Sequence, residues 1–212
     1  MPTERLPVSS TAAILLILAM PVMARAQTPP SDGVYMLDRA ASTVGFTLYG
    51  SAIFKFKRDG YFKDFSGLVA YDPARPADTR VDLTVDAASI DTRNSENDQL
   101  LRSGEFFDVE HYPTIHFTSE SANIRPDGTL SVTGDMTIRG ITRKMTIPVT
   151  LRPTTLQGSM PGAAFESTFQ IDRTEFGLNG NASRYGFHVS IAKKVDIHIA
   201  IAARPSTPTL SQ

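Results

Sequence analysis

Apolar and polar residues alternate along most of this chain, and this period of two limits the possible folds more than any other sequence feature. In the clearest run, Leu130, Val132, Met136 and Ile138 alternate with serine, threonine and aspartate. Similar runs occupy residues 81–85, 144–151, 165–171 and 195–201, and weaker ones residues 44–48 and 115–117. Because successive strand side chains point to opposite faces of a sheet, each run predicts a strand with one apolar and one wet face.

Turn residues separate these runs. Glycine, proline and aspartate, which favour turns, occur at Asp59–Gly60, Asp72–Pro73, Pro126–Gly128 and Arg139–Gly140. The Arg139–Gly140 pair lies between two alternating runs and therefore predicts a hairpin. Pro148 lies on the polar face of its run, so that strand is expected to be an edge or to be bulged there.

One segment, residues 94–104, departs from the alternation. It contains good helix formers, begins with Asn94 as a suitable N-cap and ends at Gly104. About eight strands with one short helical segment predict an all-β fold, either an up-and-down barrel or a sandwich. An outer-membrane barrel would show the same alternation, but the chain has no tryptophan for an aromatic girdle. We therefore favour a barrel whose apolar face points inward.

The two ends of the chain are expected to lie outside this fold. Residues 1–26 read as a cleaved secretory signal peptide, with an apolar run over 12–20 and small residues at Ala24 and Ala26. That run is shorter than the roughly 20 apolar residues of a membrane-spanning helix. The expected domain is then 27–203, followed by a polar, proline-containing tail at 204–212, and the expected location is the periplasm. The chain has no cysteine, so disulfides cannot stabilise it.

The sequence shows little that is typical of catalysis. The G-x-S-x-G, glycine-rich phosphate-loop and H-E-x-x-H patterns are absent, and the histidines at 111, 116, 188 and 198 are scattered. We interpret them as solvated or hydrogen-bonded side chains, and expect no catalytic residue, no metal site and no cofactor. An enzyme using a serine with His111 or His188 is the rival interpretation. The net charge of −1 argues against nucleic acid as a partner.

Binding is the function class that remains. The interior of an eight-stranded barrel can be filled with side chains or can hold one small ligand. Periodicity does not distinguish the two, because an apolar face looks the same when it lines a core or a cavity.

Several short motifs, in a fixed order, resemble those of the YceI-like family of polyisoprenoid-binding periplasmic proteins. Each is weak alone, and together they extend over nearly all of the chain after the signal peptide. They lie at residues 35–38, 42–46, 60–67, 89–92, 98–103, 106–119, 134–142 and 171–178.

The resemblance implies an extended, antiparallel, eight-stranded lipocalin-like barrel whose apolar interior takes up an isoprenoid chain, such as a polyprenyl lipid or an isoprenoid quinone. It leaves open a carrier of a fatty-acid derivative, or a stress-response barrel without ligand transport. The chain departs from the family where a histidine often precedes the leucine of the Asp-x-His-Leu-Arg run and Leu100 stands instead, which predicts a more purely apolar site. The tunnel residues that we expect are Phe46, Phe62, Phe65, Leu100, Leu101, Phe106, Phe107, Phe117, Met136, Phe169 and Phe176.

A basic and aromatic stretch predicts the entrance to this tunnel. Phe54 and Phe56 alternate with Lys55 and Lys57, and Arg58 follows. These cations are expected to form a rim that meets an anionic head group or, transiently, a membrane surface. A solvated strand face is the alternative. The sequence leaves a dimer open.

Overall fold

The computed structural model describes residues 33–52, 54–72, 74–156, 160–180, 183–184, 187–188 and 190–206. The expected signal peptide at 1–26 and most of the expected tail lie outside these residues. Within them, no helix has both the length and the apolar character needed to cross a bilayer.

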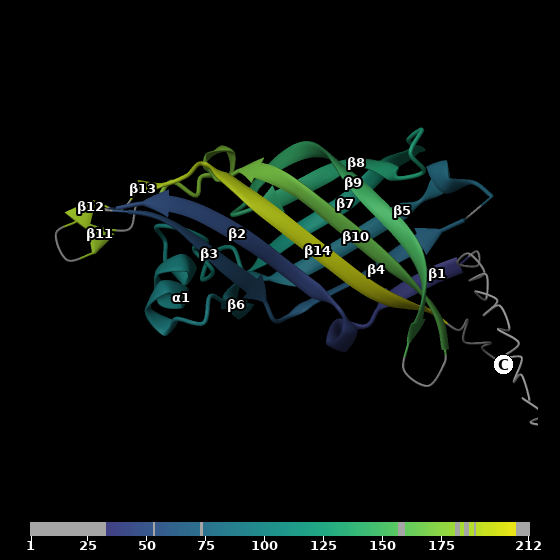
Figure 1. The fold of residues 1–212 in the computed structure, drawn as a ribbon, viewed down its shortest axis with the longest axis horizontal. Coiled ribbons are helices and arrows are strands. Elements are labelled where there is room, and N and C mark those ends of the chain that lie inside the picture. The colour runs from purple at the N-terminus through teal and green to yellow at the C-terminus, as the bar shows by residue number, and fades with distance from the viewer. Residues whose placement is uncertain are drawn as a thin grey trace, which may run out of the picture.

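Eight antiparallel strands close into a barrel, which confirms the predicted fold (Figure 1). In order around the barrel they are β1 (Gly33–Leu37), β4 (Phe65–Tyr71), β5 (Arg80–Asp86), β7 (Thr114–Ile124), β8 (Leu130–Ile138), β9 (Ile141–Leu156), β10 (Met160–Asp172) and β14 (Lys194–Pro205). Pairing of β1 with β14 closes the ring. Strand β14 continues past the expected domain boundary at residue 203, because Arg204 and Pro205 still pair with β1.

A second group of strands extends one end of the barrel. One edge of β14 pairs with two strands. The first half of β14 pairs along this edge with β2 (Thr43–Ser51), and the second half pairs with β1. Strand β2 in turn pairs with β3 (Lys55–Phe62) and, at its tip, with β13 (Ser190–Ile191). The short β6 (Ile90–Asp91) pairs with β3, and β11 (Ser183–Arg184) with β12 (Phe187–His188). The β2–β3 hairpin therefore reaches beyond the ring.

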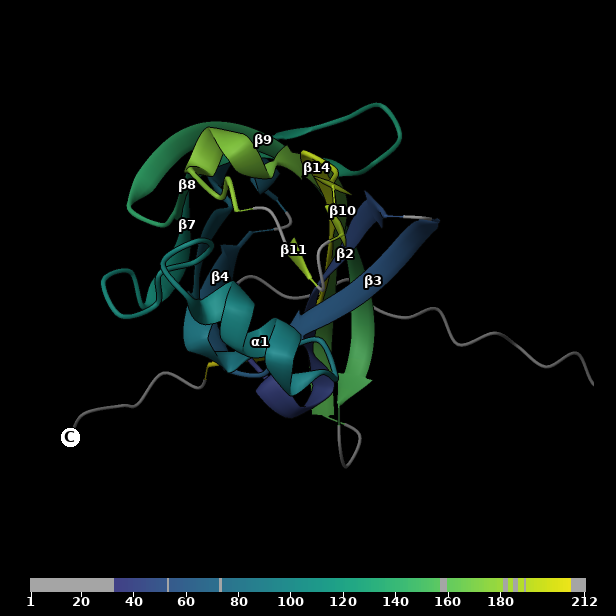
Figure 2. The ribbon, with the colours of Figure 1, turned by 90° about the vertical axis from the view of Figure 1, so that its left-hand side faces the viewer.

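Helix α1 (Ser95–Arg102) lies at this same end, beside β3 and β6 (Figures 1 and 2). It corresponds to the helix predicted at 94–104. The Asn94 side chain accepts a hydrogen bond from the Asn97 backbone N–H at 3.0 Å, which satisfies one of the free donors of the first turn. Arg102 donates to the carbonyls of Ala88 and Ile90 and so ties the helix to the sheet. Short 3₁₀ helices occupy Arg39–Ala41, Pro76–Asp78, Ala87–Ser89 and Arg173–Phe176.

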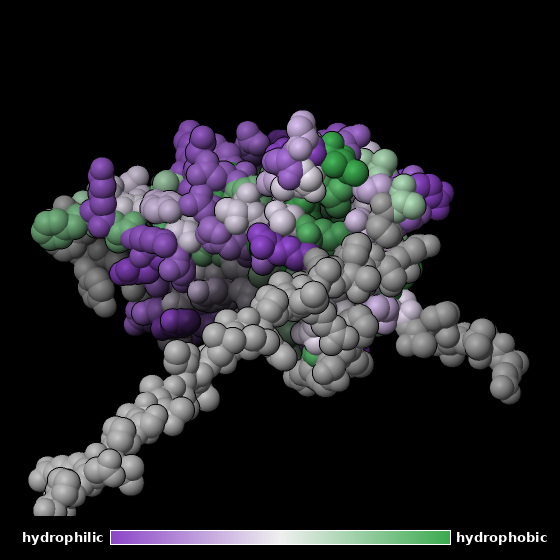
Figure 3. Space-filling model, turned by 45° about the vertical axis from the view of Figure 1, so that its right-hand side comes forward, coloured by the Kyte–Doolittle hydropathy of each residue, from purple (hydrophilic) through white to green (hydrophobic). Residues whose placement is uncertain are grey.

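The alternation seen in the sequence turns the apolar faces inward. In β8, Leu130, Val132, Met136 and Ile138 are buried together with Gly134, while the residues that alternate with these five are partly exposed. The outer face carries charges such as Lys144, which pairs with Glu120 and with Asp135. Figure 3 shows many hydrophilic residues on one face, beside smaller apolar patches. This distribution is the reverse of that in a membrane-spanning barrel, where the apolar band faces outward.

Of the four expected turns, two are confirmed and one is wrong, and the fourth, Asp72–Pro73, includes Pro73, which lies outside the described residues. Gly128 and Gly140 adopt φ values of 82° and 69° in their turns, which glycine tolerates. The Asp59–Gly60 pair instead lies inside β3, with Gly60 opposite Phe46. A Cβ at Gly60 would stand 2.3 Å from Phe46 Cζ. Glycine is therefore required there by close packing and not by a turn.

Pro148 marks a local edge, as expected. The pairing of β9 with β10 ends at Thr150 and Glu166, so that Pro148, two residues earlier in β9, is not paired with β10. Pro148 has no N–H to offer, and the Ser167 hydroxyl donates to its carbonyl at 2.6 Å. The backbone ladder ends here because proline cannot donate to it, and the Ser167 side chain bridges the two strands instead.

Candidate functional site

An apolar cavity lies inside the barrel at the end near α1. Its volume is about 100 Å³. A single buried water needs only about 10–15 Å³ of such volume. The lining comes from α1, the segment after it, strands β2, β3, β5, β7, β8, β10, β13 and β14, and the segment that follows β10. The barrel is therefore not packed solid in the middle.

A second apolar cavity, of about 60 Å³, continues the first toward the β1 end of the barrel. Its lining includes Leu37, Val69 and Phe165. Both cavities are lined by Leu83, Phe117, Met136 and Ile199. These four side chains form a constriction between two chambers, so the apolar space follows much of the barrel's length.

The structure brings most of the expected tunnel residues together. Those that line the first cavity are Phe46, Phe62, Leu101, Phe106, Phe107, Phe117, Met136 and Phe169. Three others line neither cavity. Phe65 and Phe176 are buried in the surrounding core, and Leu100 is half-buried on α1.

Aromatic rings from three elements form one wall of the first cavity. The Phe46 and Phe62 ring centroids are 5.8 Å apart, and Phe62 meets Phe107 edge to face, also at 5.8 Å. The end of α1 positions Phe107, whose backbone N–H donates to the Leu101 carbonyl at 2.9 Å. Such aromatic pairs are favourable beyond their buried area, so the wall holds its shape.

The sequence interpretation missed a charged residue in this lining, Arg173. The other described lining residues are apolar or glycine. Arg173 is 6% exposed, and burial lowers the pKa of its guanidinium, partly opposed by the nearby Asp172 carboxylate. It stands in the series Phe165, Ser167, Phe169 and Ile171, all on the inward face of β10. Continuing that alternation by one step would have placed it inside.

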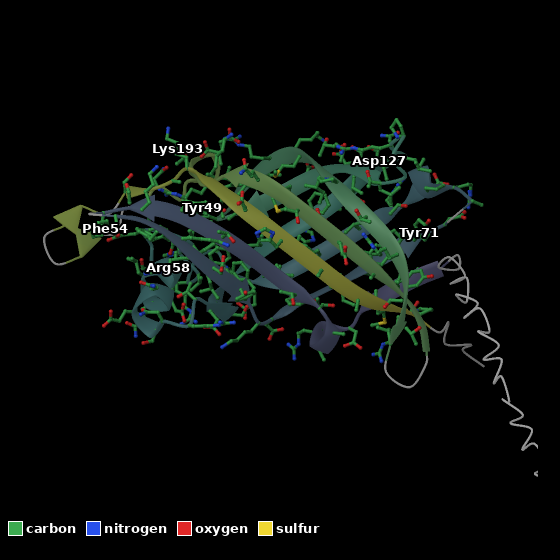
Figure 4. The ribbon with its side chains drawn as sticks, viewed as in Figure 1. Tyr49, Phe54, Arg58, Tyr71, Asp127 and Lys193 are labelled. Atoms are coloured by element: carbon green, nitrogen blue, oxygen red, sulfur yellow. The ribbon has the colours of Figure 1, made fainter. Side chains whose placement is uncertain are left out.

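The cations of the expected rim do not share one face. Lys55 and Lys57 lie on the outer face of β3, where Lys57 Nζ is 3.6 Å from Asp59 Oδ1. Arg58 lies on the inner face, opposite Leu48, which lines the cavity, and its guanidinium sits 5.4 Å from the Phe56 ring centroid. Phe54, at the hairpin tip, is 81% exposed. Figure 4 shows Phe54 and Arg58 at the α1 end of the molecule.

The histidines lie away from the cavity lining where their side chains are described. His116 contacts Asp82 at 3.3 Å, His198 contacts Thr47 at 3.3 Å, and His111 Nδ1 is 2.8 Å from Asp108 Oδ1. The hydrogen bond that the His111 ring donates to the Asp108 carboxylate raises the pKa of His111. The side chain of His188 lies outside the described atoms. In the part of the chain that the structure covers, His, Asp and Glu do not gather in threes as metal ligands.

Comparison with known proteins gives a consistent result. The family model for the YceI-like domain matches residues 35–203. Protein YceI of Escherichia coli O157:H7 is 38% identical over 125 residues, which are 56% of this chain and 62% of that protein. The matched region thus spans less than two thirds of that relative.

Solved structures share the fold. The Burkholderia cenocepacia protein BcnA superimposes with a TM-score of 0.65 at 26% identity, covering 78% of this chain and 98% of that one. A polyisoprenoid binding domain from Saccharophagus degradans, at 13% identity, gives a TM-score of 0.59 and covers 81% and 98%.

Proposed function

Since this chain belongs to the YceI-like domain family, we propose that it is a lipid-binding barrel that holds one long apolar chain in its interior. The preferred ligand is an isoprenoid, either a polyprenyl lipid or an isoprenoid quinone. The proposal includes export to the periplasm and binding without turnover, so that the protein is a carrier or a store and not an enzyme.

The observation that carries the proposal is the apolar cavity inside the barrel. A core would fill this space at the density of an organic crystal, whereas here the inward-facing Phe169, Ile197 and Ile199 remain partly exposed. The description of the Saccharophagus degradans domain as polyisoprenoid binding supports the same class of ligand.

The mechanism is partition of the chain between environments. Moving a hydrocarbon chain from water into the cavity gains roughly 0.8 kcal/mol for each buried CH₂ group. Against a membrane donor that gain largely cancels, so the protein exchanges lipid with membranes. A long tail must pass the constriction, and Met136 suits that position because its unbranched side chain can change rotamer.

The direct test is extraction of the purified protein with organic solvent, followed by mass spectrometry and by uptake of added prenyl chains. We expect a stoichiometric lipid with an isoprenoid tail. A fatty-acid derivative instead would support the alternative carrier. No lipid and no uptake would leave a barrel with another role, such as the stress-response alternative.

A matched pair of variants tests whether the ligand lies inside the barrel. Met136→Trp adds bulk at the constriction, while Val34→Trp adds similar bulk on the outer face of β1, where Val34 is 42% exposed. We expect Met136→Trp to lose uptake and Val34→Trp to keep it. A folded Met136→Trp protein that binds as well as the wild type would show that the lipid lies elsewhere.

The β2–β3 hairpin is the proposed point of contact with a membrane. Its tip carries the exposed Phe54 beside three cations, a combination that suits an anionic interface. Arg58→Glu should slow lipid pickup from anionic vesicles. The control is Arg125→Glu, which makes the same charge change in the β7–β8 turn. This turn also contains Asp127 and lies at the other end of the barrel (Figure 4), so the variant should leave the rate of lipid pickup unchanged. Equal rates for both variants would refute the contact.

A further inference from the structure

We propose that Arg173 binds an oxyanion, phosphate or carboxylate, on the head group of the lipid whose tail occupies the cavity. This inference rests on the proposed function. It assigns a polar end to a site that is otherwise apolar, and it names the acidic class of lipid that the site prefers.

The guanidinium of Arg173 is buried among neutral acceptors. Nε donates to Ala192 O at 3.0 Å, Nη2 to Ile191 O at 3.1 Å, and Nη1 to the carbonyls of Leu178 and Gly180. These carbonyls satisfy hydrogen bonds but carry no net charge. A guanidinium has five N–H groups, so one on Nη2 has no acceptor among the described residues.

No described carboxylate forms an ion pair with Arg173. The nearest acidic neighbour in sequence, Asp172, uses Oδ1 to accept from the backbone N–H of Thr174 at 2.9 Å and from its hydroxyl at 2.6 Å. Buried charges are normally paired, because an unpaired one loses its hydration without compensation. Burial also lowers the pKa of Arg173, which reflects the same cost. An anion at this point would remove that cost.

The position of Arg173 fits a head group. Its partners belong to the segment after β10 and to the segment leading into β14, at the end of the barrel where α1 and the β2–β3 hairpin lie. The hydrogen bond to Gly180 O, at 3.4 Å, is the longest of the set and the easiest to exchange for a ligand oxygen. The lining from Arg173 inward is apolar. A lipid with an acidic head and a long tail matches this order.

The test compares ligands that differ only in the head group. Affinities of the purified protein are measured for geranylgeranyl monophosphate against geranylgeraniol, and for palmitate against hexadecanol. We expect the wild type to prefer the acidic ligand by about tenfold or more, because hydrogen bonds between charged groups are roughly twice as strong as neutral ones. The acid-to-alcohol ratio of affinities is then compared between the prenyl pair and the fatty pair. The pair with the larger ratio shows whether Arg173 prefers a phosphate or a carboxylate head group.

Arg173→Met should abolish the preference and leave the affinity for the alcohols within about twofold. A purely structural arginine would instead lower all four affinities together and leave their ratio unchanged. Arg173→Lys, which keeps the charge but not the planar fork, should retain part of the preference if the methionine variant does not fold. Arg125→Gln, in the β7–β8 turn at the other end of the barrel, is the control and should leave the ratio unchanged.

Two results would overturn the inference. The first is a wild-type protein that binds acid and alcohol equally. The second is a preference that persists in Arg173→Met or disappears in Arg125→Gln. Failure of the proposed function is distinct from both, because no ligand of either pair would then bind.

Discussion

The packing of Phe46 over Gly60 gives the sharpest test of the fold around the cavity. Gly60→Ala places a methyl group where the Phe46 ring now stands, 2.3 Å from Cζ, 2.7 Å from Cε1 and 2.9 Å from Cε2. Phe46 is 7% exposed and contacts Phe62, so its ring has little room to retreat except into the cavity. We expect the variant to be less stable and to bind less lipid.

The magnitude follows from the geometry. Adding one carbon to a packed site costs about 1–3 kcal/mol. Without the clash, alanine in a strand interior would be more stable than glycine by roughly 0.5–1 kcal/mol. In a Phe46→Leu background, which removes the ring, Gly60→Ala should therefore be neutral or slightly stabilising. The coupling between the two sites should amount to about 1–3 kcal/mol, as for residues in direct contact.

Urea unfolding of the wild type, both single variants and the double variant measures this coupling. Gly45→Ala is the matched control on β2, because its Cβ would keep 3.1 Å from the ring of Tyr61, which is 37% exposed, and 3.3 Å from Gly60 O. We expect a much smaller loss of stability there. Additive free energies for Gly60→Ala and Phe46→Leu would refute the register of β2 against β3 and the aromatic wall built on it.

Three further predictions concern residues outside the cavity. Asp108→Asn should lower the pKa of His111 toward its ordinary value, as read by NMR titration, and an unchanged pKa would contradict the pairing. Since folding raises that pKa, the pairing stabilises the protein below the unfolded-state pKa of His111, and this contribution is lost as the pH rises through the folded-state pKa. Asn94→Ala should cost about 1 kcal/mol in thermal or urea unfolding, because it leaves the Asn97 N–H without its cap, and no loss would exclude the capping role. Gly177→Ala should cost about 1 kcal/mol by the same assay, because alanine is strained at a φ of 71°, and a neutral result would argue against that turn.

Much of the fold was predictable because the period of two is a local property. The strands at 81–85, 130–138 and 195–201, the helix at 94–104 and the Arg139–Gly140 hairpin all follow from neighbouring residues. The Asp59–Gly60 prediction failed for the opposite reason. Gly60 is set by contact with Phe46 on another strand, and nothing close to it in the sequence signals that contact.

The existence of a cavity could not be read from the sequence, because the same residue types line it and fill the core. On β14, Val195 and Ile201 are buried, whereas Ile197 and Ile199 between them remain partly exposed to the interior space. All four have similar, branched apolar side chains. What differs is the distance across the barrel at each level, which depends on strand pairings remote in sequence, such as those of β14 with β1 and β2.

Arg173 shows that the alternation also predicts an inward-facing charge once the inward face of β10 is known. Strand β10 places Phe165, Ser167, Phe169 and Ile171 inside, and the next inward position after the strand ends holds a cation. A charged residue at an inward position loses its hydration, so it must be compensated by structure or by a ligand. The structure provides carbonyl dipoles but no described carboxylate. The alternation that predicts the apolar interior therefore also identifies the position at which an acidic head group would bind.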